Sequence, residues 1–318
     1  MIKYDVVAIG ELNVDLILNG IERTPEIGKE VFAKDMLLTL GSSTAIFAAN
    51  IACLGSKTGF VGMIGKDTFG KLIESSLKKR GVDTSMLIYS DTYSSGATIC
   101  LNYNEDRANI TYLGAMAFMT FDNIDKTVFT QTRHIHLSSI FLQSGIKRDL
   151  LAILQFAREN NVTTSLDPQW DPKEEWDMDY KTTLPYVDIF LPNETELKHI
   201  TQSDTLEEAM SKIQPHINLC VIKCGRRGSI LLQKQKEPII LDAFINNEVV
   251  DAIGAGDSFN AGFIHSFVRG RSHKESQITG NLTGAINTTT AGGTGAFTSK
   301  EKIKDIARKK FNQELKIE

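Results

Sequence analysis

The stretch Asp251-Ala-Ile-Gly-Ala-Gly-Asp257 follows a short apolar run and opens a segment, residues 257–269, in which apolar side chains recur at three- and four-residue spacing. That spacing predicts a helix whose N-terminus is entered through a glycine-containing loop. Glycines permit unusual dihedral angles, so successive N–H groups can converge on one anion. The unpaired amides and the dipole of the helix N-terminus add to that attraction. The stretch therefore predicts an anion-binding loop.

A carboxylate, that of Asp257, lies in this predicted anion site. Two negative groups brought together suggest a base beside a phosphoryl group that is being transferred. The simpler alternative is an ordinary strand-to-helix turn whose acidic residue caps the helix. The surrounding sequence has to decide between these two interpretations.

The chain has 318 residues, of which 42% are hydrophobic and 23% charged, and its formal net charge is −4. This length suits one large α/β domain or two modest ones. The sequence lacks the clustered positive charge of a nucleic-acid surface, and no apolar run approaches the roughly 20 residues of a membrane span. The N-terminal residues lead straight into the strand-like run Val6–Gly10 without a secretory signal. We therefore expect a reduced, cytoplasmic protein with no nucleic-acid or membrane partner.

Short apolar runs alternate with helix-patterned segments along most of the chain. The predicted strands are 6–10, 59–64, 134–138, 162–166, 187–191 and 219–223, and the predicted helices are 44–54, 69–80, 148–160, 206–217, 257–269 and one near the C-terminus. Most strand runs are nearly continuously apolar, as in parallel strands covered on both faces. This order predicts an α/β fold: a three-layer α/β/α sandwich around a doubly wound, mainly parallel sheet. We expect residues 1–318 to form a single domain.

Two segments, about residues 12–39 and 94–114, break the alternation. The first is strand-like and helix-poor, and the second is predicted as a hairpin with strands at 96–103 and 108–113 and a turn at 104–106. We expect the two segments to pair into a small β-sheet outside the sandwich. Such a sheet could be a lid over an active site, a plain edge extension, or a homodimer surface that uses its unpaired edges.

Cysteine and histidine residues carry weaker signals. Cys220 and Cys224 lie in an apolar run typical of a buried strand, which favours core thiols over a metal or redox pair. His134 and His136 could share one strand face, but no third ligand lies nearby, so structural histidines are favoured.

Six motifs, in their order and approximate spacing, resemble those of the ribokinase-like (PfkB) carbohydrate kinase family. The resemblance covers nearly the whole chain, and each motif alone would be weak. The motifs are Gly10-Glu-Leu-Asn-Val-Asp15, Gly41-Ser-Ser-Thr-Ala45, Val61–Gly70, Leu191–Glu196, Cys224–Gly228 and Asp251–Asp257.

The resemblance implies phosphoryl transfer from ATP to a primary alcohol. It makes Asp257 the base that accepts the alcohol proton, and an ordinary pKa of about 3.9 would leave this carboxyl ionised at neutral pH. A weak base suffices because the loose transition state develops little charge on the attacking oxygen until late. The amides of Gly254, Ala255 and Gly256 would stabilise the γ-phosphoryl charge, and one such donor is typically worth roughly 10²–10³ in rate.

The resemblance also implies a nucleotide and metal side of the site. Asn193 and Glu196 would position Mg²⁺ and the triphosphate, largely through water, although a helix-capping pair is the alternative. Asp251 would organise the anion loop. Many relatives hold a monovalent cation such as K⁺ nearby, and the sequence leaves open whether this chain does. A nucleotide contact, or alternatively a plain hairpin turn, is implied for Lys223, Gly225 and Gly228.

On the substrate side, Asn13 and Asp15 would hold sugar hydroxyls, with turn and edge-strand polarity as the alternative. The helix opened by Gly41, Ser42 and Ser43 would face the substrate.

The first glycine motif departs from the family pattern. Many relatives carry a glycine at the position of Ser42 and an asparagine, which commonly touches the sugar, at the position of Ile46. One polar sugar contact is therefore expected to be missing, and Asn50, one helical turn later, would replace it only if the helix were displaced. A threonine is often found where this chain has Lys223, and the lysine could reach a phosphate instead.

These residues predict an ATP- and Mg²⁺-dependent kinase for a fructose- or ribose-like sugar. A nucleoside or a sugar acid is the alternative substrate class. A catalytically silent sugar- or nucleotide-binding protein is disfavoured because Asp257 and its glycines are intact. A dinucleotide oxidoreductase is disfavoured because no Gly-x-Gly-x-x-Gly follows the first strand.

Overall fold

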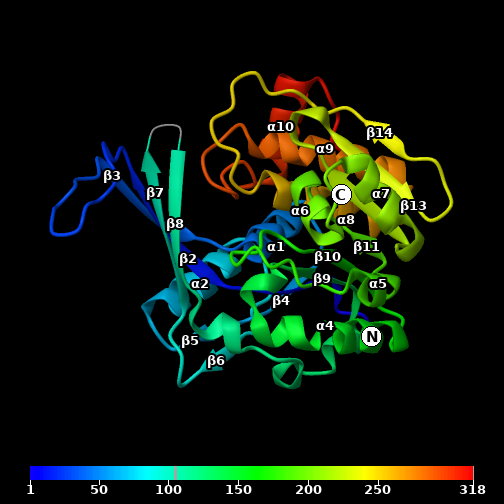
Figure 1. Ribbon diagram of the computed structural model, residues 1–318, viewed down its shortest axis with the longest axis horizontal. Coiled ribbons are helices and arrows are strands. Elements are labelled where there is room, and N and C mark those ends of the chain that lie inside the picture. The colour runs from blue at the N-terminus through cyan, green and yellow to red at the C-terminus, as the bar shows by residue number, and fades with distance from the viewer. Residues whose placement is uncertain (104–105, 318) are drawn as a thin grey trace.

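A mainly parallel sheet forms the centre of the computed structural model, which describes residues 1–103 and 106–317 (Figure 1). Within these residues, eight strands pair in the order β14-β13-β12-β11-β10-β9-β1-β4. All pairs from β12 to β4 are parallel, whereas β13 is antiparallel to both of its neighbours. The bounds are Tyr4–Ile9 (β1), Thr58–Val61 (β4), Thr132–Ser138 (β9), Thr163–Asp167 (β10), Ile189–Phe190 (β11), Leu219–Lys223 (β12), Ser229–Gln233 (β13) and Ile239–Leu241 (β14).

Helices cover both faces of this sheet, because the side chains of its strands alternate between two buried clusters. On β1, Val7 and Ile9 belong to one cluster, and Val6 and Ala8 belong to the other. The first cluster includes helices α4 (Ser144–Glu159), α6 (Glu194–Thr201) and α7 (Leu206–Ile213). The second includes α1 (Ser43–Cys53), α2 (Thr68–Lys79), α8 (Ala255–Phe267), α9 (His273–Asn287) and α10 (Lys300–Phe311). The predicted three-layer α/β/α class is confirmed.

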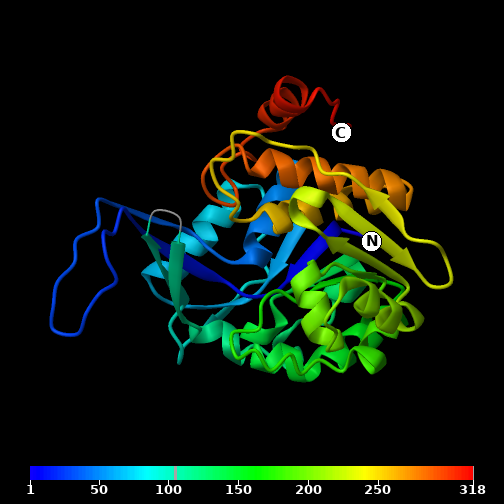
Figure 2. The same ribbon diagram turned by 45° about the horizontal axis from the view of Figure 1, so that its top comes forward.

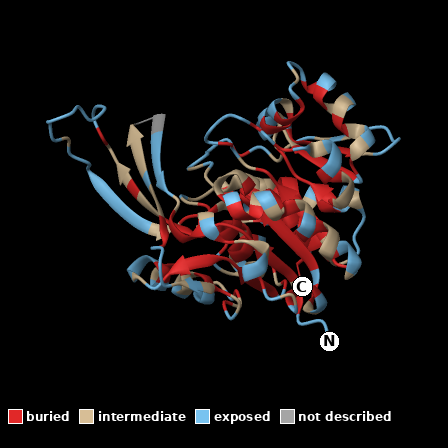
Figure 3. Ribbon diagram, turned by 60° about the horizontal axis from the view of Figure 1, so that its bottom comes forward, coloured by how far each residue is buried: buried red, intermediate tan, exposed pale blue. Residues whose placement is uncertain are grey.

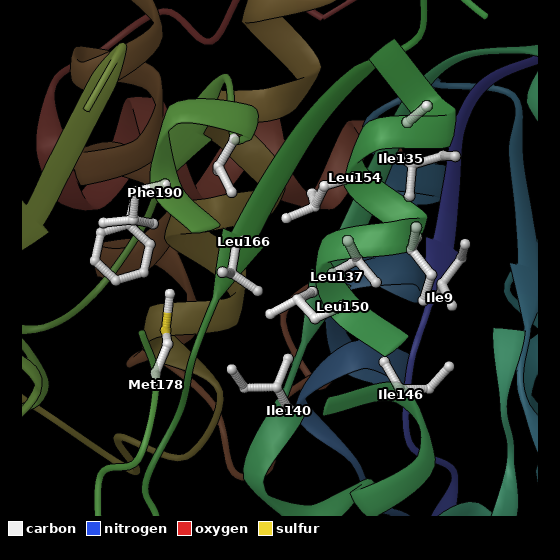
Figure 4. Close-up of a cluster of buried hydrophobic side chains, with 14 of the residues drawn as sticks. Ile9, Ile135, Leu137, Ile140, Ile146, Leu150, Leu154, Leu166, Met178 and Phe190 are labelled. Carbon is white, nitrogen blue, oxygen red and sulfur yellow. The ribbon is translucent and has the colours of Figure 1, made fainter. Parts of the chain in front are cut away.

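The first cluster shows how the sandwich is held together. Leu150 and Leu154 of α4 lie over Leu137 of β9 and Leu166 of β10 (Figure 4). Burying one such leucine side chain contributes about 1.5–3 kcal/mol. Two further short helices, α3 (Val128–Gln131) and α5 (Tyr180–Thr183), connect the larger elements.

A second, small sheet stands beside one end of the sandwich (Figures 1 and 2). Its strands are β3 (Asp35–Leu40), β2 (Asn13–Asn19), β7 (Gly96–Tyr103) and β8 (Asp106–Tyr112), paired in that order. The parallel pair of β2 and β7 joins the two far-apart segments that break the helix–strand alternation. The predicted strand at 96–103 coincides with β7, and the strand predicted over 108–113 is β8, which begins earlier, at Asp106, and ends at Tyr112. Residues 104–105 of the predicted turn lie outside the described residues.

The two faces of this small sheet differ in polarity. Asn13 and Asp15 of β2 share one face with Thr98 of β7 and Thr111 of β8. The intervening positions give the other face an apolar surface, because strand side chains alternate. That apolar face carries Leu16, Leu18, Met36, Leu38, Ile99, Ile110 and Tyr112. Several of them are exposed, and β3 is drawn largely as exposed in Figure 3.

Several local predictions differ from the structure, and the strand expected over 187–191 is reduced to Ile189–Phe190. The strand expected over 59–64 is divided at Gly62, where a Cβ atom would lie 2.7 Å from Leu12 Cδ1. Its second part is β5 (Met63–Gly65), which pairs with β6 (Ile88–Ser90). Helix α7 ends at Ile213 rather than 217, because Pro215 cannot continue the helix. The predicted helices include neither α6 nor α9.

None of the helices within the described residues is both long and apolar enough to span a bilayer.

Candidate active site

Polar and charged side chains gather at the carboxyl ends of the parallel strands, where open α/β sheets bind their ligands. Glu11 follows β1, Ser139 follows β9, and Asp167 ends β10. Lys223 ends β12, and Asp257 lies in the first turn of α8. The carboxyl ends of β1, β9, β10 and β12 and the N-terminus of α8 thus meet at one place.

The anion loop has the backbone geometry that its glycines suggested. Gly254 caps α8 with φ +74°, and a Cβ atom there would lie 2.5 Å from the Cα of Gly293. Only glycine fits this position without displacing the backbone. The carboxylate of Asp251 accepts hydrogen bonds from the amides of Ile253 and Gly292, both at 2.9 Å, and so ties two loops together. This arrangement accords with an organising role for Asp251.

The first turn of α8 leaves backbone amides without intrahelical partners, as every helix N-terminus does. Ala255 is the exception among the three predicted donors, because its N–H donates to the carbonyl of Ala252 at 3.2 Å. A ligand would therefore have to displace this turn hydrogen bond to use the amide of Ala255.

Asp257 is buried, with 6% of its surface exposed. Burial raises the pKa of its carboxyl well above the ordinary value, and the nearby carboxylates, Asp167 first, add to the rise, while Lys223 opposes it. The side-chain amide of Gln169 donates to its Oδ1 at 2.9 Å. The sequence predicted an ordinary pKa here. The structure differs because desolvation depends on packing that no local motif reveals.

Lys223 forms a buried ion pair beside Asp257. Its Nζ donates to Oδ2 of Asp167 at 2.6 Å, and the Asp167 side chain is fully buried. Burial alone would lower the pKa of Lys223, but the negative charges of Asp167 and Glu196 outweigh that effect and raise it. The Nζ also lies 3.7 Å from where a Cβ of Gly256 would be. The structure thus places a cation next to the anion loop.

Asn193 and Glu196 form the capping box that was the structural alternative. Asn193 Oδ1 accepts from the Glu196 amide at 2.8 Å, and Glu196 Oε2 accepts from the Asn193 amide at 2.8 Å. Asn193 Nδ2 donates to the other Glu196 oxygen at 2.6 Å. Burial, then the negative charge of Asp167, raises the pKa of Glu196 to about 7. Both of its oxygens are engaged, which suits holding a water molecule better than direct binding of a metal.

Gly225 and Gly228 lie in the turn between β12 and β13, so the predicted hairpin is present. Gly228 has φ +92°, and a Cβ atom there would lie 2.0 Å from the carbonyl oxygen of Leu241. Gly225 has φ +57° and open space around its Cα. These glycines are required by the turn, whatever else they do.

Asn13, Asp15 and Gly41, which were predicted to face the substrate, lie close together. A Cβ atom on Gly41 would be 2.2 Å from Asp15 Oδ1 and 2.9 Å from Asn13 Oδ1. Asn13 Nδ2 donates to Thr98 Oγ1 at 2.7 Å, whereas its buried Oδ1 has no hydrogen-bond partner among the described residues. Burial raises the pKa of Asp15 to about 6. This cluster joins the polar face of the small sheet to the start of α1.

Ser42 caps α1 in a strained conformation. Its φ of 73° falls where glycine is favoured, its Oγ accepts from the Ala45 amide at 3.0 Å, and it donates to the Glu11 carbonyl at 2.6 Å. Ser43 is the first residue of α1.

Ile46, in the next turn, is buried against Gly254 and Gly293, so it packs on the anion loop instead of offering a polar group. Asn50 donates to Ser258 and Gly293 and does not replace the missing contact.

We expect Ser42→Gly to be better tolerated than Ser42→Ala. Glycine relieves a backbone strain of about 1–3 kcal/mol but loses the hydroxyl. The free energy of unfolding of the Ser42→Gly variant should therefore stay within about 1 kcal/mol of the wild-type value. Alanine loses the cap, which costs about 1 kcal/mol, and keeps the strain. Urea unfolding of both variants measures this order. A glycine variant less stable than the alanine variant would contradict the strain argument.

Four residues near the site were not singled out by sequence reasoning. Glu11 is a buried carboxylate that accepts from the Thr44 amide at 3.2 Å and from Ser139 Oγ at 2.9 Å. Asp167, Gln169 and Asn260 form the hydrogen-bonded surroundings of Asp257 and Lys223. The available signal was the polar pair Asp167 and Gln169 directly after a predicted apolar strand.

The remaining candidates for metal ligands have structural partners. His134 lies within 2.8 Å of Thr163 Oγ1 and Ser165 Oγ, and His136 lies 2.7 Å from Ser165 Oγ. Cys220 is fully buried. Among the residues that the structure describes, no group of three or more His, Cys, Asp or Glu side chains is arranged to hold a metal ion.

Comparison with known proteins agrees with this geometry. Residues 3–300 match the pfkB family carbohydrate kinases, and the chain belongs to that family. It is therefore a carbohydrate kinase with a ribokinase-like fold. It is similar to 5-dehydro-2-deoxygluconokinase of Geobacillus thermodenitrificans, with 30% identity over 284 residues, covering 84% of this chain and 82% of that protein.

Two further comparisons place the fold. The structure of Arabidopsis thaliana ribokinase complexed with ribose and ATP matches with a TM-score of 0.84 and 25% identity, over 95% of this chain and 98% of that one. The ribokinase of Thermotoga maritima matches with a TM-score of 0.83 and 22% identity, over 96% of this chain and 99% of that one.

Proposed function

We propose that this enzyme transfers the γ-phosphoryl group of ATP to a primary hydroxyl of a fructose- or ribose-like sugar. The observation that carries the proposal is a buried carboxylate, Asp257, in the first turn of α8 directly after the glycine loop. Membership of the carbohydrate kinase family supports the reaction class. The structural likeness to a ribokinase complexed with ribose and ATP supports the pair of substrates.

In this proposal Asp257 accepts the proton of the sugar hydroxyl as the phosphoryl group moves. The helix N-terminus and the amides of Gly254, Ala255 and Gly256 stabilise the charge on the transferred group. Lys223, held by Asp167 beside Gly256, supplies a positive charge on the same side. Most of the catalytic effect would then come from positioning and electrostatics.

Asn193 and Glu196 would position Mg²⁺ through water, and Lys223, Gly225 and Gly228 would line the nucleotide. The engaged oxygens of Glu196 fit this indirect arrangement, since Mg²⁺ keeps several of its own waters. When bound, the metal neutralises charge on the phosphates.

The sugar would lie between Asn13 and Asp15 on one side and Gly41, Ser42 and Ser43 on the other. The orphaned Oδ1 of Asn13 offers an acceptor for a sugar hydroxyl. We infer that the small sheet acts as a lid and that residues 1–318 form one domain. Saturating sugar should then slow amide hydrogen exchange in β2 and β7, and unchanged exchange would count against the lid.

A sugar acid is the second candidate substrate. It is favoured by the identity to 5-dehydro-2-deoxygluconokinases, of which the Geobacillus protein is one. The partly buried carboxyl of Asp15 favours a neutral sugar instead, because an anion beside it would be repelled. The two candidates therefore differ in one measurable property, the charge of the accepted substrate.

The test is ADP release, coupled to a detectable reaction, with Mg-ATP and a panel of ketoses, aldoses, sugar acids and nucleosides. Asp257→Asn serves as the blank, and Na⁺ and K⁺ salts at equal ionic strength test whether a monovalent cation activates. Turnover of a neutral sugar by the wild-type enzyme, with none by Asp257→Asn, would support the proposal. Turnover of a sugar acid alone would select the second candidate. Silence from protein that binds ATP would contradict both.

We also propose that a second copy of the chain covers the apolar face of the small sheet. Met36, Ile110 and Tyr112 are each more than half exposed there, and exposed apolar patches of this kind mark association surfaces. Ile110→Lys should shift the mass in sedimentation from dimer to monomer, whereas Lys309→Met on α10 should not. A wild-type protein that sediments as a monomer at micromolar concentration would contradict the proposal.

A further inference from the structure

We propose that Gln169 positions the catalytic carboxylate by joining Asp257 to the buried carboxylate of Asp167 through one amide nitrogen. Gln169 Nε2 donates to Asp257 Oδ1 at 2.9 Å and to Asp167 Oδ2 at 3.0 Å. This inference rests on the proposed role of Asp257 as the base. It identifies Gln169 as the residue that holds the carboxylate of Asp257 in a fixed orientation.

Asp167 is a rigid anchor for this link. Its side chain is fully buried, and its Oδ2 also accepts from Lys223 Nζ and from Asn260 Nδ2. Its Oδ1 accepts from the backbone amide of Gln169 at 3.2 Å. Since Asp167 ends β10, the whole arrangement is fixed to the central sheet. Gln169 is the member of this arrangement that contacts the base directly.

The backbone of Gln169 gives independent support. Its φ is 59°, in the left-handed region where a residue with a Cβ atom is strained. Such strain costs about 1–3 kcal/mol and persists where the surrounding structure requires it. A glycine would relieve the strain but would lose the amide. The strained glutamine suggests that the side chain, rather than the turn, is what this position requires.

The charges around Asp257 explain why a neutral donor matters there. The negative charges of Asp167 in β10, Glu196 in α6 and Glu11 after β1 disfavour its ionised form, and the positive charge of Lys223 favours it. A hydrogen bond donated to a carboxylate favours its ionised form. Without the Gln169 amide, Asp257 would lose a hydrogen bond that favours its ionised form.

The test compares Gln169→Gly and Gln169→Met with wild type. Both should lower kcat by about 10- to 100-fold, the usual effect of losing one hydrogen bond to a charged group, and leave the KM values for sugar and ATP within about twofold. Activity should also require a higher pH than in wild type. Gln214→Met is the matched control, since its amide donates to the carbonyls of Gln233 and Lys236 at the connection between β13 and β14. It should match wild type.

The glycine variant separates positioning from a structural role. If Gln169 served only the turn, glycine would keep or raise the stability and the activity, and that result would overturn the inference. Combining Gln169→Met with Asp257→Asn should lower the residual rate no further, because the amide acts through the base. Additive losses would also overturn it. Full activity of Asp257→Asn alone would instead refute the proposed base.

Discussion

Asp257→Asn should lower kcat by about 10²–10⁴, the usual contribution of a positioned base. The thermal unfolding midpoint should stay the same or rise. The carboxyl has a pKa raised by burial, so its folded-state pKa lies above the unfolded one. Its contribution to stability is therefore present at low pH and is lost as the pH rises through the folded pKa. At neutral pH the amide removes that penalty. Steady-state kinetics and calorimetry on the same preparation measure both effects.

The pH dependence of the wild-type enzyme tests the same carboxyl. A base must be deprotonated to act, so kcat/KM should fall as the pH is lowered through the raised pKa, at a higher pH than for an exposed aspartate. Bound ligands add charges that shift the pH at which kcat/KM falls, so the comparison is made at saturating magnesium. A variant with near-normal kcat, or an acid limb near the ordinary value of about 3.9, would refute the assignment.

Lys223→Met should destabilise the folded protein by about 3–5 kcal/mol, because it leaves the buried carboxylate of Asp167 without its cation. The same change should lower turnover, since Lys223 is the charge that opposes protonation of Asp257. Urea unfolding and kcat measure the two effects. Adding Asp167→Asn should restore part of the stability, because no unpaired charge remains.

The control is an exposed ion pair elsewhere in the chain. Lys309 and Asp305 lie 2.8 Å apart on α10, with 69% and 41% of their side chains exposed. Removing an exposed pair of this kind costs less than about 1 kcal/mol, so Lys309→Met should have little effect. If Lys223→Met lowered the free energy of unfolding no more than Lys309→Met does, the buried ion pair would be unimportant for stability.

Much of the fold could be predicted because its signals are local. The anion loop and α8 were predicted from the glycines and the apolar spacing over 257–269, and the structure confirms a helix over Ala255–Phe267. Hairpin strand β7 was likewise predicted from its own alternation. By contrast, α9 carries glycines at 280 and 284 that let it pack closely on Phe259 of α8. Those same glycines hide its helical pattern.

The surroundings of Asp257 could not be predicted, because they are long-range. Gln169 and Asp257 are 88 positions apart in the chain, and Lys223 and Asp167 are 56 apart. The sequence indicated that Lys223 was unusual and could reach a phosphate, but not that a buried aspartate holds it. No local sequence pattern indicates which strand ends lie next to one another in the folded protein.

The alternation of the small sheet has a consequence for insertions and deletions. Asp15 and Thr98 face the polar side, and their neighbours Leu16 and Ile99 face the apolar side. Losing or gaining one residue within β2 or β7 would rotate every following side chain to the opposite face. Single substitutions change one contact, whereas a one-residue deletion early in β2 would turn its leucines toward the polar face and the carboxylate of Asp15 toward the apolar face. The length of these two strands is therefore more tightly constrained than their individual residues.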